Sequence, residues 1–229
     1  MIITIDGPAG TGKSTVAHAV SQQLGFDFLD TGAMYRAAAL LTLRKGVPLD
    51  DSAAIAAAVR DIDIQFDFSC HPPTLLLSGQ PIADALRTPD VDLAASIVAA
   101  VGAVRTVLVD QQRQIGRQRP NLVSEGRDQG SVVFPDATAH FYLDASPHAR
   151  ARRRAEQLRA RGQPVDDQLL LDEIIARDHR DMTRAVAPLV APPGAIRIDS
   201  TDLDFQQVVD RIVALSRPLL QQKPAGGYY

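Results

Sequence analysis

The strongest constraint on this sequence is an eight-residue run near its start, Gly7-Pro8-Ala9-Gly10-Thr11-Gly12-Lys13-Ser14. It fits the pattern G-x-x-x-x-G-K-[ST] at every position, with an apolar stretch at 2–6 before it and a helix-forming stretch at 13–24 after it. Glycines let such a loop wrap so that several backbone N–H groups point at phosphate, and the helix N-terminus adds its dipole. The flanking pattern argues against an incidental glycine-rich turn. The run therefore predicts a phosphate-binding loop (P-loop, residues 7–14).

The roles expected in the P-loop follow from its chemistry. We expect Lys13 to be accessible to solvent and to reach the β- and γ-phosphates of ATP, and the Ser14 hydroxyl to bind the Mg²⁺ that accompanies ATP. The residues expected to bind ATP are Gly7, Pro8, Ala9, Gly10, Thr11, Gly12, Lys13, Ser14 and Thr15.

Two common classes of P-loop protein fit this chain poorly. A GTPase needs the guanine-binding pattern Asn/Thr-Lys-x-Asp, and neither Lys45 nor Lys223 lies in one. A mechanical ATPase usually has an apolar strand ending in Asp-Glu, whereas the strand expected at 121–124 is followed by Glu125. For Glu125 two interpretations remain open, a magnesium partner acting through water or a strand-end carboxylate that caps a turn.

Composition narrows the setting of the protein. The chain has 229 residues, 45% hydrophobic, and a net charge of −3, so nothing in its overall charge favours nucleic acid or an anionic membrane. Its one cysteine, Cys70, excludes an intrachain disulfide and a multi-cysteine zinc site. We find neither a signal peptide nor an apolar run of the ~18 residues that a membrane span requires. We therefore expect a cytoplasmic protein without nucleic-acid or membrane partners.

Short apolar strands alternate with longer helical stretches, which predicts an α/β fold with a mainly parallel sheet. The strands are expected at 2–6, 26–29, 121–124, 140–143 and 195–198. The helices are expected at 13–24, 33–45, 90–118, 147–161, 166–184 and 204–220, with a further short one at 52–60. Between 62 and 89, two strand-like pieces at 62–66 and 74–77 predict a small inserted antiparallel sheet. We expect residues 221–229 to form a disordered tail.

Four blocks, in this order and spacing, resemble the signature blocks of bacterial cytidylate kinases. They are the P-loop, Asp30-Thr31-Gly32-Ala33-Met34-Tyr35-Arg36, the run from Glu125 to Asp136, and the run from Arg177 to Leu189. The likeness extends from residue 2 to about 215. It implies a P-loop core (1–30, 115–146, 185–220) with a five-stranded parallel sheet, a nucleoside-monophosphate-binding region (31–114) and a lid (147–165), all within one domain, 1–220.

The resemblance also implies an activity, transfer of the γ-phosphoryl group of ATP to CMP or dCMP with Mg²⁺, by an enzyme that we expect to be a monomer. By position, Arg36, Arg127 and Arg184 match the arginines that hold the acceptor phosphate. Ser96, Arg105 and Asp128 match the residues that recognise cytosine. Arg177 and Asp181 match those that bind the sugar, with Thr31 nearby. Arg127 and Arg184, with Lys13, are also the expected catalytic groups.

The chemistry of these residues agrees with the resemblance, although less specifically. Two polyanions must meet, and arginine grips phosphate with a planar fork that stays charged. Arg177, Asp181 and Arg184 share one helix face at i, i+4 and i+7. Without the resemblance, a solvated Arg–Asp pair there and a plain helix-face role for Ser96 would be preferred. A departure is Gln129, which stands where an apolar residue is usual and could alter the base pocket.

Six arginines crowd the helix expected at 147–161: Arg150, Arg152, Arg153, Arg154, Arg159 and Arg161. They fit a solvated basic helix, an RNA-binding patch or, by the resemblance, a lid over the transferring phosphate. Arg153 and Arg154 are the candidate lid residues. The net acidic chain disfavours RNA. Two rival functions also remain, a P-loop kinase for another small molecule and a non-catalytic nucleotide-binding module.

Overall fold

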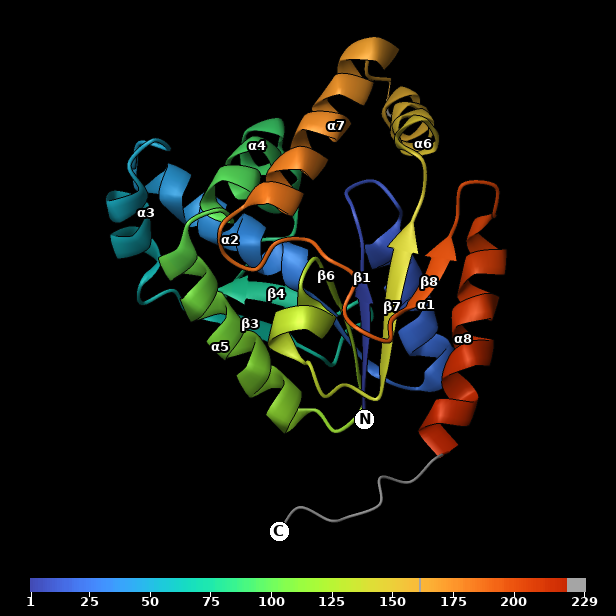
Figure 1. Cartoon of the computed structure of the whole chain (residues 1–229). Helices are drawn as coiled ribbons and strands as arrows, with labels where there is room; N and C mark the ends of the chain where they lie inside the picture. The colour runs from blue at the N-terminus through green and yellow to red at the C-terminus, as the bar shows by residue number, and fades with distance from the viewer. Residues whose placement is uncertain (161, 222–229) are drawn as a thin grey trace.

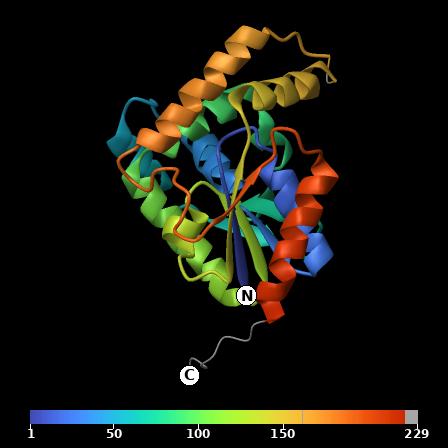
Figure 2. The same cartoon turned by 45° about the vertical axis from the view of Figure 1, so that its right-hand side comes forward.

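The computed structural model describes residues 1–160 and 162–221, in which five parallel strands form the central sheet (Figures 1 and 2). The strand order is β2-β6-β1-β7-β8, and every neighbouring pair is parallel. The bounds are β1 (Ile2–Asp6), β2 (Asp27–Asp30), β6 (Leu122–Gly126), β7 (Ala139–Asp144) and β8 (Ile196–Asp199). The expected α/β fold and all five of its parallel strands are confirmed, within one or two residues at each end.

Helices cover both faces of this sheet, and two more lie beyond the carboxyl ends of its strands (Figure 1). Helices α1 and α8 pack on one face, where their apolar residues join those of β1, β7 and β8. Helices α2, α4 and α5 build a second core on the other side. The bounds are α1 (Lys13–Leu24), α2 (Thr31–Arg44), α3 (Ser52–Val59), α4 (Pro89–Val98), α5 (Gly102–Gln118), α6 (Pro147–Arg159), α7 (Asp167–Thr183) and α8 (Phe205–Gln221).

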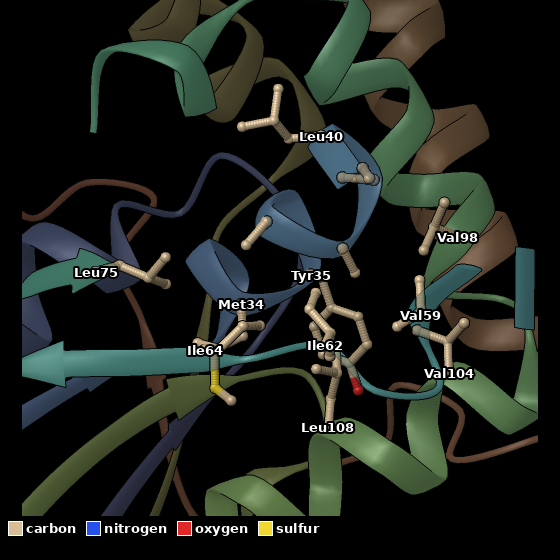
Figure 3. Packing of buried hydrophobic residues seen from close by; sticks show 14 of the residues in the cluster. Met34, Tyr35, Leu40, Val59, Ile62, Ile64, Leu75, Val98, Val104 and Leu108 are labelled. Carbon is tan, nitrogen blue, oxygen red and sulfur yellow. The ribbon is translucent and has the colours of Figure 1, made fainter. Parts of the chain in front are cut away.

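The expected small antiparallel sheet is present between α3 and α4. It consists of β3 (Ile64–Asp67), β4 (Thr74–Leu77) and β5 (Gln80–Pro81), followed by the short 3₁₀ helix η1 (Asp84–Arg87). Its apolar side chains pack against α2 and the neighbouring helices (Figure 3). Members of this core are Met34, Tyr35, Leu40, Ile62, Ile64, Leu75, Val98, Val104 and Leu108. The insert is thus built onto the helices that lead into the site.

One helix prediction was wrong. The stretch 90–118 is not a single helix but two, α4 and α5, which meet at 97°. Val101 is extended there, and Gly102 opens the second helix. The Arg105 side chain reaches back to bond the Ala99 carbonyl at 3.1 Å, which satisfies an otherwise unpaired group at the end of α4. Continuous apolar periodicity hid this break from the sequence.

Smaller differences lie at element ends. Helix α2 begins at Thr31 rather than 33, because the Asp30 carboxylate accepts the Ala33 N–H at 2.8 Å and caps the helix. The helix expected to reach 161 ends at Arg159. Gln221 belongs to α8, so the expected tail cannot begin there, and its remainder, 222–229, lies outside the described residues. The division into core, acceptor-binding and lid regions stays a prediction.

Within residues 1–160 and 162–221, no single helix has the length and apolar composition to cross a membrane. Helices α4 and α5 satisfy that criterion only when taken together across their bend.

A buried carboxylate at the end of β1 joins the sheet to the turn after β6. Asp6 accepts the backbone N–H groups of Gln129 and Gly130, both at 2.8 Å, at the start of a single π-helical turn, η2 (Gln129–Val133). Burial raises the pKa of Asp6 to about 6, against the lowering effect of these two bonds. Asp6 therefore fixes the turn at the cost of holding a charge in a dry site.

We predict that this cost appears in the pH dependence of stability. The unfolded chain releases the Asp6 proton at its ordinary pKa of 3.8, whereas the pKa in the folded protein is about 6. Stability is therefore lost as the pH rises between these two values, and the loss is constant above them. The full loss corresponds to about 3 kcal/mol. Urea unfolding should show the stability of the wild type relative to Asp6→Asn falling by up to that amount from about pH 4 to about pH 7. An equal difference at both pH values would contradict the assignment.

Candidate active site

Parallel strands end at one edge of the sheet, and the candidate residues gather there because each follows a strand. The P-loop follows β1, Thr31 follows β2, and Arg127 and Asp128 follow β6. Helices α6 and α7 lie above this edge (Figures 1 and 2). The topology therefore brings together residues that are more than a hundred positions apart in sequence.

The P-loop has the backbone that its glycines permit. Gly7 has φ of 153° and lies so close to the carbonyl oxygen of Leu143, at the end of β7, that a Cβ atom there would clash with it. Gly12 is left-handed, with φ of 83°, and leads directly into α1. Side chains at these two positions would displace the loop.

The expectation that Lys13 is accessible to solvent was wrong. Its side chain is 5% exposed and bends back over the loop, where Nζ donates to the Pro8 carbonyl at 2.6 Å. Burial, helped by the nearby Arg127 charge, lowers the pKa of Lys13 to about 7. The P-loop thus holds its own lysine through a carbonyl group, a contact that a phosphate oxygen can replace with a charged partner.

Ser14 contacts one carboxylate beside the P-loop, and a second carboxylate lies next to the first. The Ser14 hydroxyl donates to Glu125 Oε1 at 2.7 Å, so the Glu125 side chain lies at the P-loop instead of capping a turn. Burial and the neighbouring Asp30 carboxylate raise the pKa of Glu125 to about 7, and Lys13 opposes that rise. These oxygen atoms are of the kind that Mg²⁺ prefers.

Asp30 was quoted in a sequence block but given no role. The structure places it between β2 and α2, capping the helix and facing Glu125. Its position directly after a strand, at the same edge as the P-loop, is the signal that could have identified it.

The acceptor-side arginines form one charged group around two carboxylates. Arg127 Nε donates to Asp181 Oδ2 at 2.9 Å, and Arg184 Nη1 lies 3.9 Å from Asp181 Oδ1. Arg36 Nε donates to Asp92 Oδ1 at 3.1 Å. Thr31, buried below them, donates to the Glu125 carbonyl at 2.7 Å.

Some arginine donors in this group have no partner. Arg177 Nε and Arg184 Nη2 are buried, and neither has a hydrogen-bond partner within residues 1–160 and 162–221. Burial and the neighbouring Arg127 lower the pKa of Arg177 to about 10, which shows that positive charges crowd here. Unpaired buried donors are costly, so this arrangement favours a bound anion.

Of the three residues expected to recognise cytosine, Arg105 and Asp128 contact each other, and Ser96 contacts a different residue. Arg105 and Asp128 form a buried ion pair, each with 3% of its side chain exposed, and the Arg105 guanidinium stacks on Tyr35 at 5.0 Å. Ser96 lies on α4 and accepts a 3.3 Å bond from Arg180 Nε. Tyr35 was not predicted, although its hydroxyl is buried without a partner among the described residues.

The two lid candidates, Arg153 and Arg154, point in different directions. Arg154 lies toward the pair formed by Arg36 and Asp92, with its Nη2 3.7 Å from Asp92 Oδ2. Arg153 turns away and donates to Ser200 Oγ at 3.2 Å and to carbonyls between β8 and α8. The structure therefore brings Arg154, and not Arg153, to the site. Asp92, which contacts both Arg36 and Arg154, was missed, and nothing in its local sequence distinguishes it from the neighbouring Asp90.

Comparison with known proteins agrees with this geometry. A sequence model of the cytidylate kinase family matches residues 3–217. The cytidylate kinase of Azotobacter vinelandii is 44% identical over 216 residues, covering 93% of this chain and 94% of that protein. The enzyme of Stutzerimonas stutzeri is 45% identical over 215 residues, covering 93% of each. Among solved structures, an uncharacterized protein from Eubacterium ventriosum has the same fold, with a TM-score of 0.51, 13% identity, and coverage of 95% and 98%. The chain belongs to the cytidylate kinase family.

Proposed function

We propose that this protein transfers the γ-phosphoryl group of ATP to CMP and dCMP, giving ADP and CDP or dCDP. The observation that carries the proposal is the meeting, at one sheet edge, of a complete P-loop and a buried arginine group with unpaired donors. One binds the phosphates of the donor, and the other has the charge to hold the phosphate of the acceptor. Membership of the cytidylate kinase family supports this assignment.

On the donor side, the P-loop N–H groups bind the ATP phosphates, and Lys13 exchanges the Pro8 carbonyl for phosphate oxygens. The low pKa of Lys13 rises once a polyanion replaces that carbonyl, so the ammonium is charged when ATP is bound. Ser14 and Glu125, with Asp30 next to Glu125, would hold Mg²⁺, which would neutralise charge on the β- and γ-phosphates.

On the acceptor side, Arg36, Arg127 and Arg184 hold the CMP phosphate in line with the γ-phosphate, and Arg154 lies near enough to join them. Arg177 and Asp181 lie where the sugar would bind. Asp128 accepts from the exocyclic amine of cytosine, with Arg105 and Ser96 serving its acceptor atoms. We also infer a monomeric cytoplasmic enzyme that uses nucleotides and not nucleic acid.

Two rivals differ from this proposal in their substrates. A kinase for another small molecule would phosphorylate a different acceptor, and a nucleotide-binding module would bind ATP without transfer. An assay of ADP release with each nucleoside monophosphate, and with other small-molecule acceptors such as shikimate, separates all three. The proposal requires CMP and dCMP to be the best acceptors.

The first substitution test concerns the P-loop lysine. Lys13→Ala should lower kcat for CMP phosphorylation by at least about 10²-fold, because it removes a charge directed at the developing negative charge. Far-UV circular dichroism should stay unchanged. Lys45→Ala is the matched control, since Lys45 is exposed and its ammonium donates to the Ala58 carbonyl, 2.8 Å away and remote from the P-loop. Near-normal turnover by folded Lys13→Ala would refute the kinase assignment.

The second test concerns base recognition. Asp128→Asn presents a donor to the cytosine amine and loses a charged hydrogen bond worth roughly 1.5–3 kcal/mol. We expect kcat/KM for CMP to fall about ten- to a hundredfold. UMP has a carbonyl in place of the amine and should lose less, although Arg105 loses its partner with both substrates.

The control for base recognition is Arg127→Ala, which removes a phosphate contact and should impair CMP and UMP alike. Both variants are assayed with both acceptors at saturating ATP. If Asp128→Asn lowers the two values of kcat/KM by the same factor, Asp128 does not recognise the base.

A further inference from the structure

A buried ion pair joins the two helices above the P-loop, and no role assigned so far uses it. Arg150 lies in the first turns of α6, and Asp178 lies in α7. Arg150 Nη2 is 2.6 Å from Asp178 Oδ2, and only 3% and 11% of the two side chains are exposed. Such a pair is costly to bury unless its remaining hydrogen-bonding atoms are also satisfied.

Those remaining atoms hold the two peptide groups that flank Ala9 in the P-loop. The Ala9 N–H donates to Asp178 Oδ1 at 3.3 Å, and the Ala9 carbonyl accepts from Arg150 Nη1 at 2.8 Å. Arg150 Nε donates to the Ala145 carbonyl at 2.9 Å, just after β7. Asp178 and Arg150 thus connect four segments: the P-loop, the end of β7, α6 and α7.

The next P-loop residue, Gly10, lies close to Arg150. Gly10 has φ of 77°, and a Cβ atom at this position would lie 3.3 Å from Arg150 Cβ. The P-loop binds phosphate through backbone N–H groups, whose directions are set by the planes of successive peptides. Fixing the peptide groups on both sides of Ala9 therefore fixes where the following N–H groups point.

We propose that Arg150 and Asp178 are positioning residues for the donor nucleotide, which set the peptide planes of the P-loop from α6 and α7. The inference rests on the proposed function, which supplies ATP as the donor and CMP as the acceptor. In this role Arg150 does not itself bind phosphate, because its Nε, Nη1 and Nη2 atoms each have a protein partner and its side chain is buried. The pair acts through the loop that it holds.

This role predicts a separation of the two substrates. In the proposed function the acceptor phosphate is held by Arg36, Arg127 and Arg184. Within residues 1–160 and 162–221, the hydrogen bonds and ion pairs of these arginines are with Asp92, Asp181 and backbone carbonyls outside the P-loop. Loosening the P-loop should therefore weaken ATP binding and leave CMP binding nearly intact. A general loss of folding would weaken both.

The test uses the full chain with Arg150→Met, Asp178→Asn, Arg150→Lys and the double variant Arg150→Met/Asp178→Asn. Calorimetry measures Kd for an unreactive ATP analogue with Mg²⁺ and, separately, for CMP. We expect each single variant to weaken the ATP analogue about tenfold or more, because small displacements of a binding loop are costly. The double variant should bind the analogue no more weakly than the weaker-binding single variant, since the two paired residues together hold the peptide groups that flank Ala9. Kd for CMP should stay within about twofold.

A matched control lies on the same two helices. Arg159 of α6 and Asp167 of α7 form an ion pair at 2.7 Å, but their side chains are 51% and 67% exposed. Arg159→Met and Asp167→Asn remove the same kinds of group from the same elements without touching the P-loop. Both should bind the ATP analogue as the wild type does.

Several results would overturn the proposal. Unchanged or tighter analogue binding by Asp178→Asn, with weakening by Arg150→Met, would make Arg150 a direct phosphate ligand. Equal weakening of the ATP analogue and CMP, or weakening in the control variants, would show only destabilisation. Should the single variants fail to fold, Arg150→Met/Asp178→Leu removes both charges together, and wild-type affinity in that folded variant would also refute the role.

The failure of this proposal is distinguishable from that of the proposed function. Binding of the ATP analogue is measured without any acceptor. A wild-type protein that binds the analogue but does not phosphorylate CMP would refute the function while leaving the positioning test intact.

Discussion

The site depends on carboxylates that hold its arginines together. Burial, together with repulsion from Arg127 and Arg36, lowers the pKa of Arg177 to about 10. Asp181 and Asp92 offset this repulsion by pairing with Arg127 and Arg36, and Asp128 does the same for Arg105. The carboxylates preorganise the positive charge, and enough donors are left unpaired to attract a phosphate.

The parallel sheet places these charges. Because β1, β2, β6 and β7 all end at one edge, the residues that follow them face a common space, and Asp6 fixes the turn after β6 through two backbone bonds. The raised pKa of Asp6 shows that this anchoring has a cost. In return, the anchored turn sets the positions of Arg127 and Asp128, which directly precede it.

The sequence predicted the parts of this arrangement that depend on local pattern. The P-loop glycines, the five strands and the insert followed from periodicity and from a motif whose chemistry is specific. The bend between α4 and α5 did not, because the side chain that satisfies the end of α4 is that of Arg105, in the first turn of the next helix. The burial of Lys13 was missed for a similar reason, since its partner is the loop's own carbonyl.

The site residues likewise divide into those that the sequence pattern predicted and those that only packing could place. Arg127, Asp128, Arg177, Asp181 and Arg184 lie in recognisable runs, and the structure brings them together. Arg153 and Arg154 are adjacent, and only packing decides which one faces the site; Arg153 is held by carbonyls between β8 and α8. Asp92 acquires its position from contacts with Arg36 and Arg154, which come from two other helices. Sequence spacing carries no information about such contacts.

Helix α7 is where the two halves of the site meet. Asp178 faces the P-loop, and Asp181 lies almost one turn later and faces Arg127, so carboxylates of one rigid element hold both the donor loop and an acceptor arginine. Any displacement of α7 relative to the sheet must therefore change the two contacts together. A helix that bridges the sites in this way can couple the geometry of one phosphate to that of the other without a direct contact between the two loops. Transfer between two phosphate groups needs both to be correctly placed, so a helix that contacts both the P-loop and Arg127 suits the proposed reaction.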